Sequence, residues 1–92
     1  MKYLLEYSDE AIEGMRKHQK SGDKQAIKKL DKLLEEIELN PKSGTGNPER
    51  LKHFEGSHWS REITRKHRFV YEIFDNIILV EVTQAWGHYN DK

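Results

Sequence analysis

The stretch WSREITRKHRFVYEIFDNIILVEVTQA, residues 59–85, decides the fold of this 92-residue chain. It contains three segments rich in β-branched and aromatic residues, which are typical of β-strands. These segments lie near Trp59–Thr64, His67–Phe74 and Ile77–Ala85. The pairs between them, Arg65-Lys66 and Asp75-Asn76, predict tight turns, and Asp and Asn tolerate the positive φ that such turns use. The stretch therefore predicts a three-stranded antiparallel β-meander.

The part of the chain before this stretch predicts an amphipathic helix. Its apolar residues recur three and four positions apart, as on the buried face of a helix. They are Ile27, Leu30, Leu33, Leu34 and Ile37. The helix ends at Asn40-Pro41, because the residue before a proline is disfavoured in the helical conformation. Residues 40–50, NPKSGTGNPER, hold both prolines and two of the six glycines, which predicts an irregular loop of the kind that often carries function.

The N-terminal residues predict a strand followed by another helix. Lys2–Tyr7 is short, aromatic and apolar, as expected of a strand. Ser8 is a suitable N-cap for a helix that directs Ile12 and Met15 inward, with Ala11 beside them. Ser21-Gly22-Asp23 ends this helix.

Together these elements predict an α+β fold in a single domain, residues 1–92. Two N-terminal helices pack on one face of a small antiparallel sheet, in the order β-α-α-β-β-β. The other face of the sheet stays open and is the natural place for a ligand. Strand alternation separates Arg61 from Ser60, and Arg68 from Phe69, but it does not decide which set meets the helices.

The charges balance over the whole chain but not along it. There are 16 Lys and Arg against 16 Asp and Glu, hence a net charge of zero. Residues 47–68 carry six basic and three acidic residues, a local charge of +3, together with His53, His58 and His67. A local site for a polyanion is therefore compatible with overall neutrality.

The apolar runs, the N-terminal pattern and the cysteine content indicate which classes of protein to exclude. No apolar run approaches the roughly 20 residues that cross a bilayer, and the N-terminus lacks the pattern of a signal peptide. The chain has no cysteine, which excludes disulfides, thiolate metal sites and a thiol nucleophile. We therefore expect a cytoplasmic protein without contact to a membrane.

Standard catalytic motifs are not matched. His53-x-Glu55-x-x-His58 has no known metal-ligand spacing, so no metal site is predicted, and Gly44-x-Gly46 lacks the third glycine of a nucleotide-binding loop. Metal-free acid–base chemistry on a phosphate remains, and it needs a carboxylate, a histidine and an arginine but no cofactor. The composition permits such a set of residues without selecting it.

The run GTGNPERLKHFEGSHWSREITRKHRFVY, residues 44–71, strongly resembles the YoeB/Txe family of bacterial toxins in the RelE-like superfamily. Four blocks of that family occur here in order, and the resemblance extends over essentially the whole chain. They are Gly44–Lys52, Gly56–Ile63, His67–Tyr71 and Trp86–Tyr89. Two departures are Glu62, where relatives often have a second arginine, and the extension Asn90-Asp91-Lys92.

The resemblance implies a ribosome-dependent mRNA endoribonuclease that inhibits translation. Carried over by matching positions, the general base falls on Glu49, the general acid on His88 and the stabiliser of the scissile phosphate on Arg68. The residues implied to bind substrate are Lys52, Arg61, Arg65 and Tyr89. The chemistry is a transphosphorylation to a 2′,3′-cyclic phosphate, without metal or cofactor.

The resemblance also implies the partners: a YefM-like antitoxin, the ribosome and mRNA. The chain is then expected as a homodimer or as a toxin–antitoxin hetero-oligomer. The alternative is a ParE-like toxin that poisons DNA gyrase without nuclease activity, because this fold is shared between both kinds of toxin.

Overall fold

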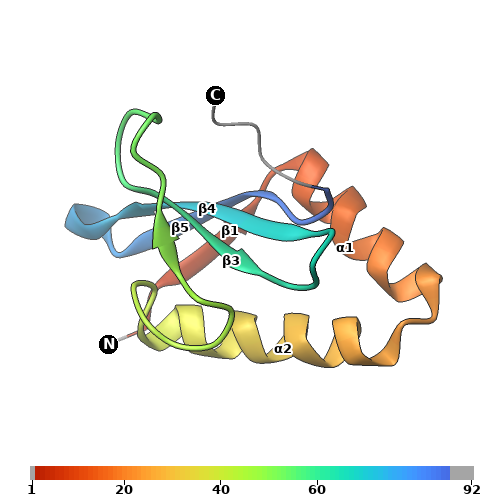
Figure 1. The fold of residues 1–92 in the computed structure, drawn as a ribbon. Coiled ribbons are helices and arrows are strands. Elements are labelled where there is room, and N and C mark those ends of the chain that lie inside the picture. The colour runs from red at the N-terminus through yellow and green to blue at the C-terminus, as the bar shows by residue number, and fades with distance from the viewer. Residues whose placement is uncertain (1, 88–92) are drawn as a thin grey trace.

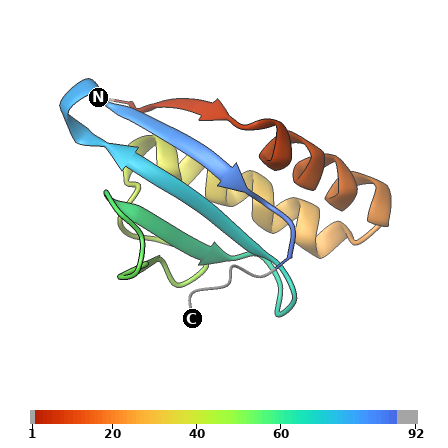
Figure 2. The same cartoon turned by 90° about the horizontal axis from the view of Figure 1, so that it is seen from above.

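Two helices cover one face of a five-stranded sheet in the computed structural model, which describes residues 2–87 (Figures 1 and 2). The elements are β1 (Leu4–Tyr7), α1 (Asp9–Ser21), α2 (Lys24–Leu39), β2 (Glu49–Arg50), β3 (His58–Glu62), β4 (Arg68–Phe74), the 3-10 helix η1 (Asp75–Ile77) and β5 (Leu79–Gln84). The α+β class is confirmed, as are both helices and the three strands of the meander.

The sheet has the strand order β1-β5-β4-β3-β2. Strands β3, β4 and β5 form the predicted antiparallel meander, and Arg65-Lys66 is the two-residue turn between Thr64 and His67. Two features differ from the prediction. β1 pairs with β5 in parallel, so the sheet is mixed, and the irregular loop contains the two-residue strand β2, which pairs with β3. Parallel strands need a long connection between them. The pairing of β1 with β5 is possible because both helices and the strands β2, β3 and β4 lie between them in the chain.

The predicted helix ends are confirmed. The Ser8 side chain accepts a hydrogen bond from the Ala11 amide, and Gly22 has a φ of 76° where α1 ends. Asp23 caps α2 in the same way through the Ala26 amide. These caps satisfy amide groups that have no partner inside a helix.

The prediction for the buried face of α1 was confirmed for Ala11 and Met15 and wrong for Ile12. Ile12 is 40% exposed, whereas Ala11, Gly14 and His18 are buried. The helix is rotated because it packs closely on the chain after β5: a Cβ at Gly14 would lie 3.0 Å from the Trp86 nitrogen. Glycine permits this approach, which carries His18 into the core. The sequence analysis had not identified His18.

The core settles which face of the sheet meets the helices. Phe69, Tyr71 and Ile73 of β4 pack with Leu33 and Ile37 of α2. Arg61 pairs with Phe69 in register, so it too points toward the helices. The face away from the helices, called the open face below, therefore carries the alternate positions. They include Glu62, Arg68 and Glu72, which are partly exposed, and Ser60 and Val70, which are buried.

The turn between β4 and β5 also differs from the prediction. The chain forms η1, and the positive φ, 55°, falls on Ile78 rather than on Asp75 or Asn76. The Asp75 carboxylate is held from outside the turn, since it accepts a hydrogen bond of 2.6 Å from the Tyr3 hydroxyl. Among the described helices, none is long and apolar enough to cross a membrane.

Candidate functional site

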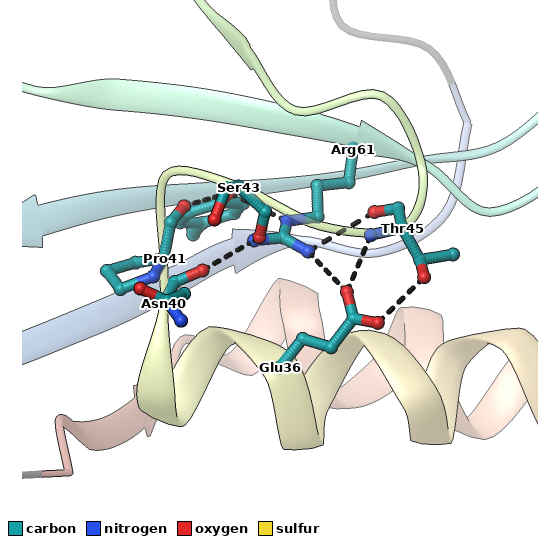
Figure 3. A network of polar contacts seen from close by, with 7 residues as sticks. Glu36, Asn40, Pro41, Ser43, Thr45 and Arg61 are labelled. Carbon is teal, nitrogen blue, oxygen red and sulfur yellow. Dashed lines mark hydrogen bonds and ion pairs between the residues drawn. The ribbon is translucent and has the colours of Figure 1, made fainter.

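A buried arginine organises the loop that leads to the candidate site (Figure 3). Arg61 is completely buried on the helix face of β3. Its Nε donates to the Tyr71 hydroxyl at 3.0 Å, and its Nη1 donates to Glu36 Oε1 at 3.0 Å and to the Thr45 carbonyl at 3.2 Å. Its Nη2 donates to the carbonyls of Asn40 at 2.9 Å and Ser43 at 2.7 Å. All five N–H groups of the guanidinium therefore have a partner.

The partners of Arg61 are themselves bound to the same loop. Glu36 accepts hydrogen bonds from the Thr45 amide at 2.6 Å and from the Thr45 hydroxyl at 2.7 Å. Tyr71 donates its hydroxyl to the Pro41 carbonyl at 2.7 Å. We call these residues, with Arg61, Asn40 and Ser43, the arginine network. It ties residues 40–45 to both α2 and the sheet.

The Gly-x-Gly pair takes part in this loop packing. Gly44 and Gly46 have φ values of 124° and 86°, which favour glycine. The Gly46 carbonyl accepts a hydrogen bond of 2.7 Å from the Glu62 amide. The loop is thus fixed to the end of β3 just before it forms β2, which contains Glu49.

The sheet register brings Glu49 and Arg68 to the same face. Glu49 pairs with Ser60, Ser60 pairs with Val70, and Glu62 pairs with Arg68. Paired residues in neighbouring strands point to the same side, so these side chains share the open face. A carboxylate from β2 and a guanidinium from β4 thus lie across one strand from each other, with Glu62 directly opposite Arg68.

Ser60 lies between these two positions and was missed by the sequence analysis. It is completely buried, yet its hydroxyl has no hydrogen-bond partner among residues 2–87. Such groups are rare in folded proteins. The serine stands beside Glu49 in register, on the strand between those that carry Glu49 and Arg68.

The chain after β5 is anchored next to Arg68. The Arg68 amide donates to the Gly87 carbonyl at 2.9 Å, and the Gly87 amide donates to His67 Nδ1 at 2.9 Å. His88 and Tyr89 lie outside the described residues, but they follow Gly87 directly in the sequence.

The remaining predicted site residues are dispersed. Lys52 is exposed in the loop after β2. Arg65 is exposed in the β3–β4 turn and lines a pocket of about 630 Å³, with Lys29, Lys66, His67 and Trp86 among the other residues around it. Arg61 is on the opposite face from Arg68. Its position suits the arginine network, and no surface of it is available to a ligand.

Among residues 2–87, no three His, Asp or Glu side chains are grouped so as to hold a metal ion. In the His53-x-Glu55-x-x-His58 segment, His58 Nδ1 lies 2.6 Å from the Glu55 carbonyl and its Nε2 lies 3.5 Å from Glu72. The site that the register assembles thus consists of a carboxylate and a guanidinium on an open sheet face.

A family model described as "YoeB-like toxin of bacterial type II toxin-antitoxin system" matches residues 7–89. The chain belongs to this family. The YoeB toxin of Escherichia coli K12 is 41% identical over 58 residues, which cover 63% of this chain and 69% of that toxin. These findings confirm the resemblance that the four sequence blocks indicated.

Solved structures of the family share the fold. A YoeB/ParE toxin from Agrobacterium tumefaciens superposes with a TM-score of 0.82 at 31% identity, covering 94% of this chain and 99% of that one. Staphylococcus aureus YoeB was solved as a dimer, with a TM-score of 0.78 at 31% identity. It was also solved in a heterotetrameric complex with YefM, with a TM-score of 0.75 at 32% identity. Both cover 97% of this chain and 100% of theirs.

The arginine network predicts that Arg61→Lys is strongly destabilising. An ammonium has three N–H donors where the guanidinium uses five, so buried acceptors lose their partners. We expect the free energy of unfolding to fall by about 3 kcal/mol, measured by urea denaturation. The control is Arg16→Lys at an exposed surface ion pair with Glu13, which should change it by less than about 0.5 kcal/mol. Equal stability of both variants would contradict the role of the network.

We predict that the contribution of Glu36 to the free energy of unfolding is lost at low pH. Burial alone raises the pKa of Glu36, but the hydrogen bonds from Thr45 and the charge of Arg61 outweigh it, so the net pKa lies below 4.5, its ordinary value. A carboxyl with a lowered pKa stabilises the fold fully above its unfolded-state pKa, and this contribution is lost as the pH falls through the folded-state pKa. Urea titrations between pH 7 and pH 3 should therefore show a smaller loss for Glu36→Gln than for the unaltered chain. Parallel curves would contradict this prediction.

Because the buried Ser60 hydroxyl finds no partner in the described part of the chain, we predict that Ser60→Ala raises the free energy of unfolding. Removing a buried donor that has no partner avoids its desolvation penalty, worth about 1 kcal/mol or more. Thermal and urea unfolding would measure the gain. Ser57→Ala is a suitable control with the opposite sign, because the Ser57 hydroxyl accepts a hydrogen bond of 3.1 Å from Trp59. A loss of stability in Ser60→Ala would show that the hydroxyl has a partner.

Proposed function

We propose that this chain is an mRNA endoribonuclease that acts on the ribosome as the toxin of its toxin–antitoxin pair. The observation that carries the proposal is the register of β2, β3 and β4. It puts Glu49 and Arg68 on one open face, with the residue before His88 bound next to Arg68. These are the three positions to which the family resemblance assigns a base, a phosphate ligand and an acid.

The proposed reaction needs no metal. The Glu49 carboxylate takes the proton of a ribose 2′-hydroxyl, whose oxygen attacks the adjacent phosphorus. Arg68, assisted by Lys52, binds the non-bridging oxygens as negative charge grows on them. The bond from phosphorus to the 5′-oxygen breaks, and His88 protonates the leaving oxygen. The products are a 2′,3′-cyclic phosphate and a free 5′-hydroxyl.

The other predicted contacts divide into two groups. Arg65 is exposed and lies beside Lys66, so it suits an RNA backbone at the margin of the site. Tyr89 follows His88, and we propose that it contacts the substrate as the family resemblance implies. Arg61 has no part in this proposal, because its guanidinium is buried and all of its N–H groups donate within the arginine network.

Partners follow from the family and from the charge. We propose a YefM-like antitoxin, as in the Staphylococcus aureus complex, and a homodimer or toxin–antitoxin hetero-oligomer in solution. Because the chain has no net charge, its affinity for free RNA should be weak. The ribosome then supplies most of the positioning of mRNA, which implies action in the cytoplasm.

The decisive test is induced expression in a bacterial host with mapping of mRNA 5′ ends. Glu49→Gln, Arg68→Gln and His88→Ala should each lower translation-dependent cleavage by at least about 100-fold, since each removes a proton-transfer or charge-stabilising group. Glu55→Gln, an exposed carboxylate in the following loop, is the matched control and should cleave normally.

Three outcomes would overturn the proposal or part of it. A variant among the three that stays fully toxic, although folded, loses its assigned role. Cleavage of free RNA at the same rate as ribosome-bound mRNA would exclude dependence on the ribosome. Growth arrest with intact mRNA and gyrase-linked DNA breaks would identify a ParE-like poison instead.

A further inference from the structure

Two hollows adjoin each other along α2, on the side of the sheet that the helices cover. The larger has a volume of about 630 Å³ and lies between the first half of α2 and the turn that joins β3 to β4, which Figure 1 shows above the helix. The smaller has a volume of about 470 Å³ and lies between α2 and Thr45 of the loop. Gln25 and Lys29 line both hollows, so they form one groove, which we call the α2 groove.

The α2 groove is strongly basic. Five cationic side chains from α2 and the β3–β4 turn line it, namely Lys28, Lys29, Lys32, Arg65 and Lys66. Among the described residues that line it, the one carboxylate is Asp23, which accepts a hydrogen bond from the Ala26 amide as the N-cap of α2. Five positive charges against one negative charge give the groove a charge of +4. Within residues 2–87, none of the five cations forms an ion pair.

The positions of these lysines do not serve the stability of α2. The helix dipole favours acidic residues in the first turn of a helix and basic residues in the last, and α1 follows this rule with Asp9 and Glu10 at its start and Lys20 at its end. α2 has no acidic residue in its first turn and no basic residue in its last. Lys28 and Lys32 are also four residues apart, a spacing at which like charges destabilise a helix. An anionic ligand gives the lysines a purpose that the helix does not.

The shape of the groove indicates an extended anion. An α-helix rises about 1.5 Å per residue, so Lys28 and Lys32 are about 6 Å apart along its axis. Lys66 lines the larger hollow from the turn, and Gln25 and Thr64 provide further hydrogen-bond donors there. A row of cations of this length suits several successive phosphates better than a single ion.

We infer that the α2 groove binds the phosphate backbone of RNA at a second site, apart from the scissile phosphate. The groove begins where the open face ends. Glu62 and Arg68 form the last register pair of β3 and β4, and the residues that follow Glu62, from Ile63 to Lys66, line the larger hollow. RNA is favoured over an acidic protein because the proposed phosphate ligand Arg68 lies at this end of the sheet, so the identity of the anion rests on the proposed function. The mRNA beside the cleavage point and the ribosomal RNA around it both present this chemistry.

The groove contributes affinity rather than chemistry. Its lysines lie along α2, on the side of the sheet opposite to Glu49 and Arg68. Each contact between a lysine and a phosphate releases condensed counterions, so its loss weakens binding and lowers the dependence of binding on salt. Binding away from the reacting group changes KM and leaves kcat as it is. Because the whole chain has a net charge of zero, the rest of it carries −4, which keeps the affinity for free RNA low.

The experiment measures RNA binding by a chain that carries Glu49→Gln and is therefore expected not to cleave. The groove variant replaces three lysines of the groove, by Lys28→Gln, Lys29→Gln and Lys66→Gln. The control variant removes the same charge from three exposed lysines outside it, by Lys2→Gln, Lys20→Gln and Lys24→Gln. A third variant places arginine at the three groove positions, which keeps the charge.

The probes are vacant ribosomes and a short single-stranded RNA, each titrated at several salt concentrations. We expect the groove variant to bind about 10-fold more weakly, with the slope of log affinity against log salt smaller by about 2. The control and arginine variants should stay within about 2-fold of the unaltered chain. Weaker binding confined to vacant ribosomes identifies ribosomal RNA as the source of the phosphates, and weaker binding confined to the single strand identifies mRNA.

Other outcomes would overturn the inference. Equal affinity of the groove and control variants for both probes would show that the groove holds no RNA. Polyglutamate that binds more tightly than RNA, and loses this affinity in the groove variant, would assign the groove to an acidic protein.

Cleavage separates the groove from the proposed function. In chains that retain Glu49, a normal KM for mRNA on ribosomes in the groove variant would overturn the groove alone. If the unaltered chain cuts no mRNA on ribosomes while the groove variant still loses affinity for RNA, the nuclease proposal fails and the RNA site stands.

Discussion

The buried guanidinium of Arg61 is the interaction on which the rest of the site depends. A charge in a protein core persists only when it is paired and its hydrogen bonds are made. Arg61 meets this condition by drawing three loop carbonyls and the Glu36 carboxylate around itself. If the irregular loop moved away from β3, the Arg61 guanidinium and the loop carbonyls would lose their hydrogen bonds. The conformation of this loop leads the chain into β2. Glu49 therefore lies on a strand that is paired with β3, although most of the residues before it form a loop.

The two arginines of the meander have different roles because a strand alternates its faces every residue. Arg61 pairs with Phe69 on the face covered by the helices, while Arg68 pairs with Glu62 on the open face. One guanidinium therefore holds the loop, and the other lies on the face of the sheet away from the helices, where we propose that the substrate binds. Glu62 opposite Arg68 sets this chain apart from relatives with an arginine there. It lowers the positive charge of the face, which supports our proposal that free RNA binds weakly.

The end of the chain is organised by the same principle as the loop. After β5, His18 binds the Ala85 carbonyl and Gln84 binds the Trp86 carbonyl, while the Arg68 amide and His67 bind the Gly87 carbonyl and amide. The histidines suit this task, because a neutral imidazole has one donor and one acceptor. The arginine network thus holds the loop that leads to β2 and Glu49, and the contacts of residues 85–87 hold the segment after β5 beside Arg68.

Local sequence signals were sufficient to predict both helices with their ends and the three strands of the meander, because periodicity and capping act between residues close in the chain. They were not sufficient for the turn between β4 and β5, which forms η1. The helices begin and end where Ser8, Gly22 and Asn40-Pro41 predicted. The family was indicated by the Pro-Glu-x-Leu-Lys and His-Arg-x-Val-Tyr blocks. Only the tertiary structure decided that β1 pairs in parallel with β5, that Ile12 is exposed while His18 is buried, and that Arg61 faces the helices. Each of these depends on contacts between residues far apart in the chain. Arg61 shares its face of the strand with Trp59 and Ile63, which was a usable signal of its burial. A strand pattern defines two faces, however, and only the packing of the helices decides which of them is buried.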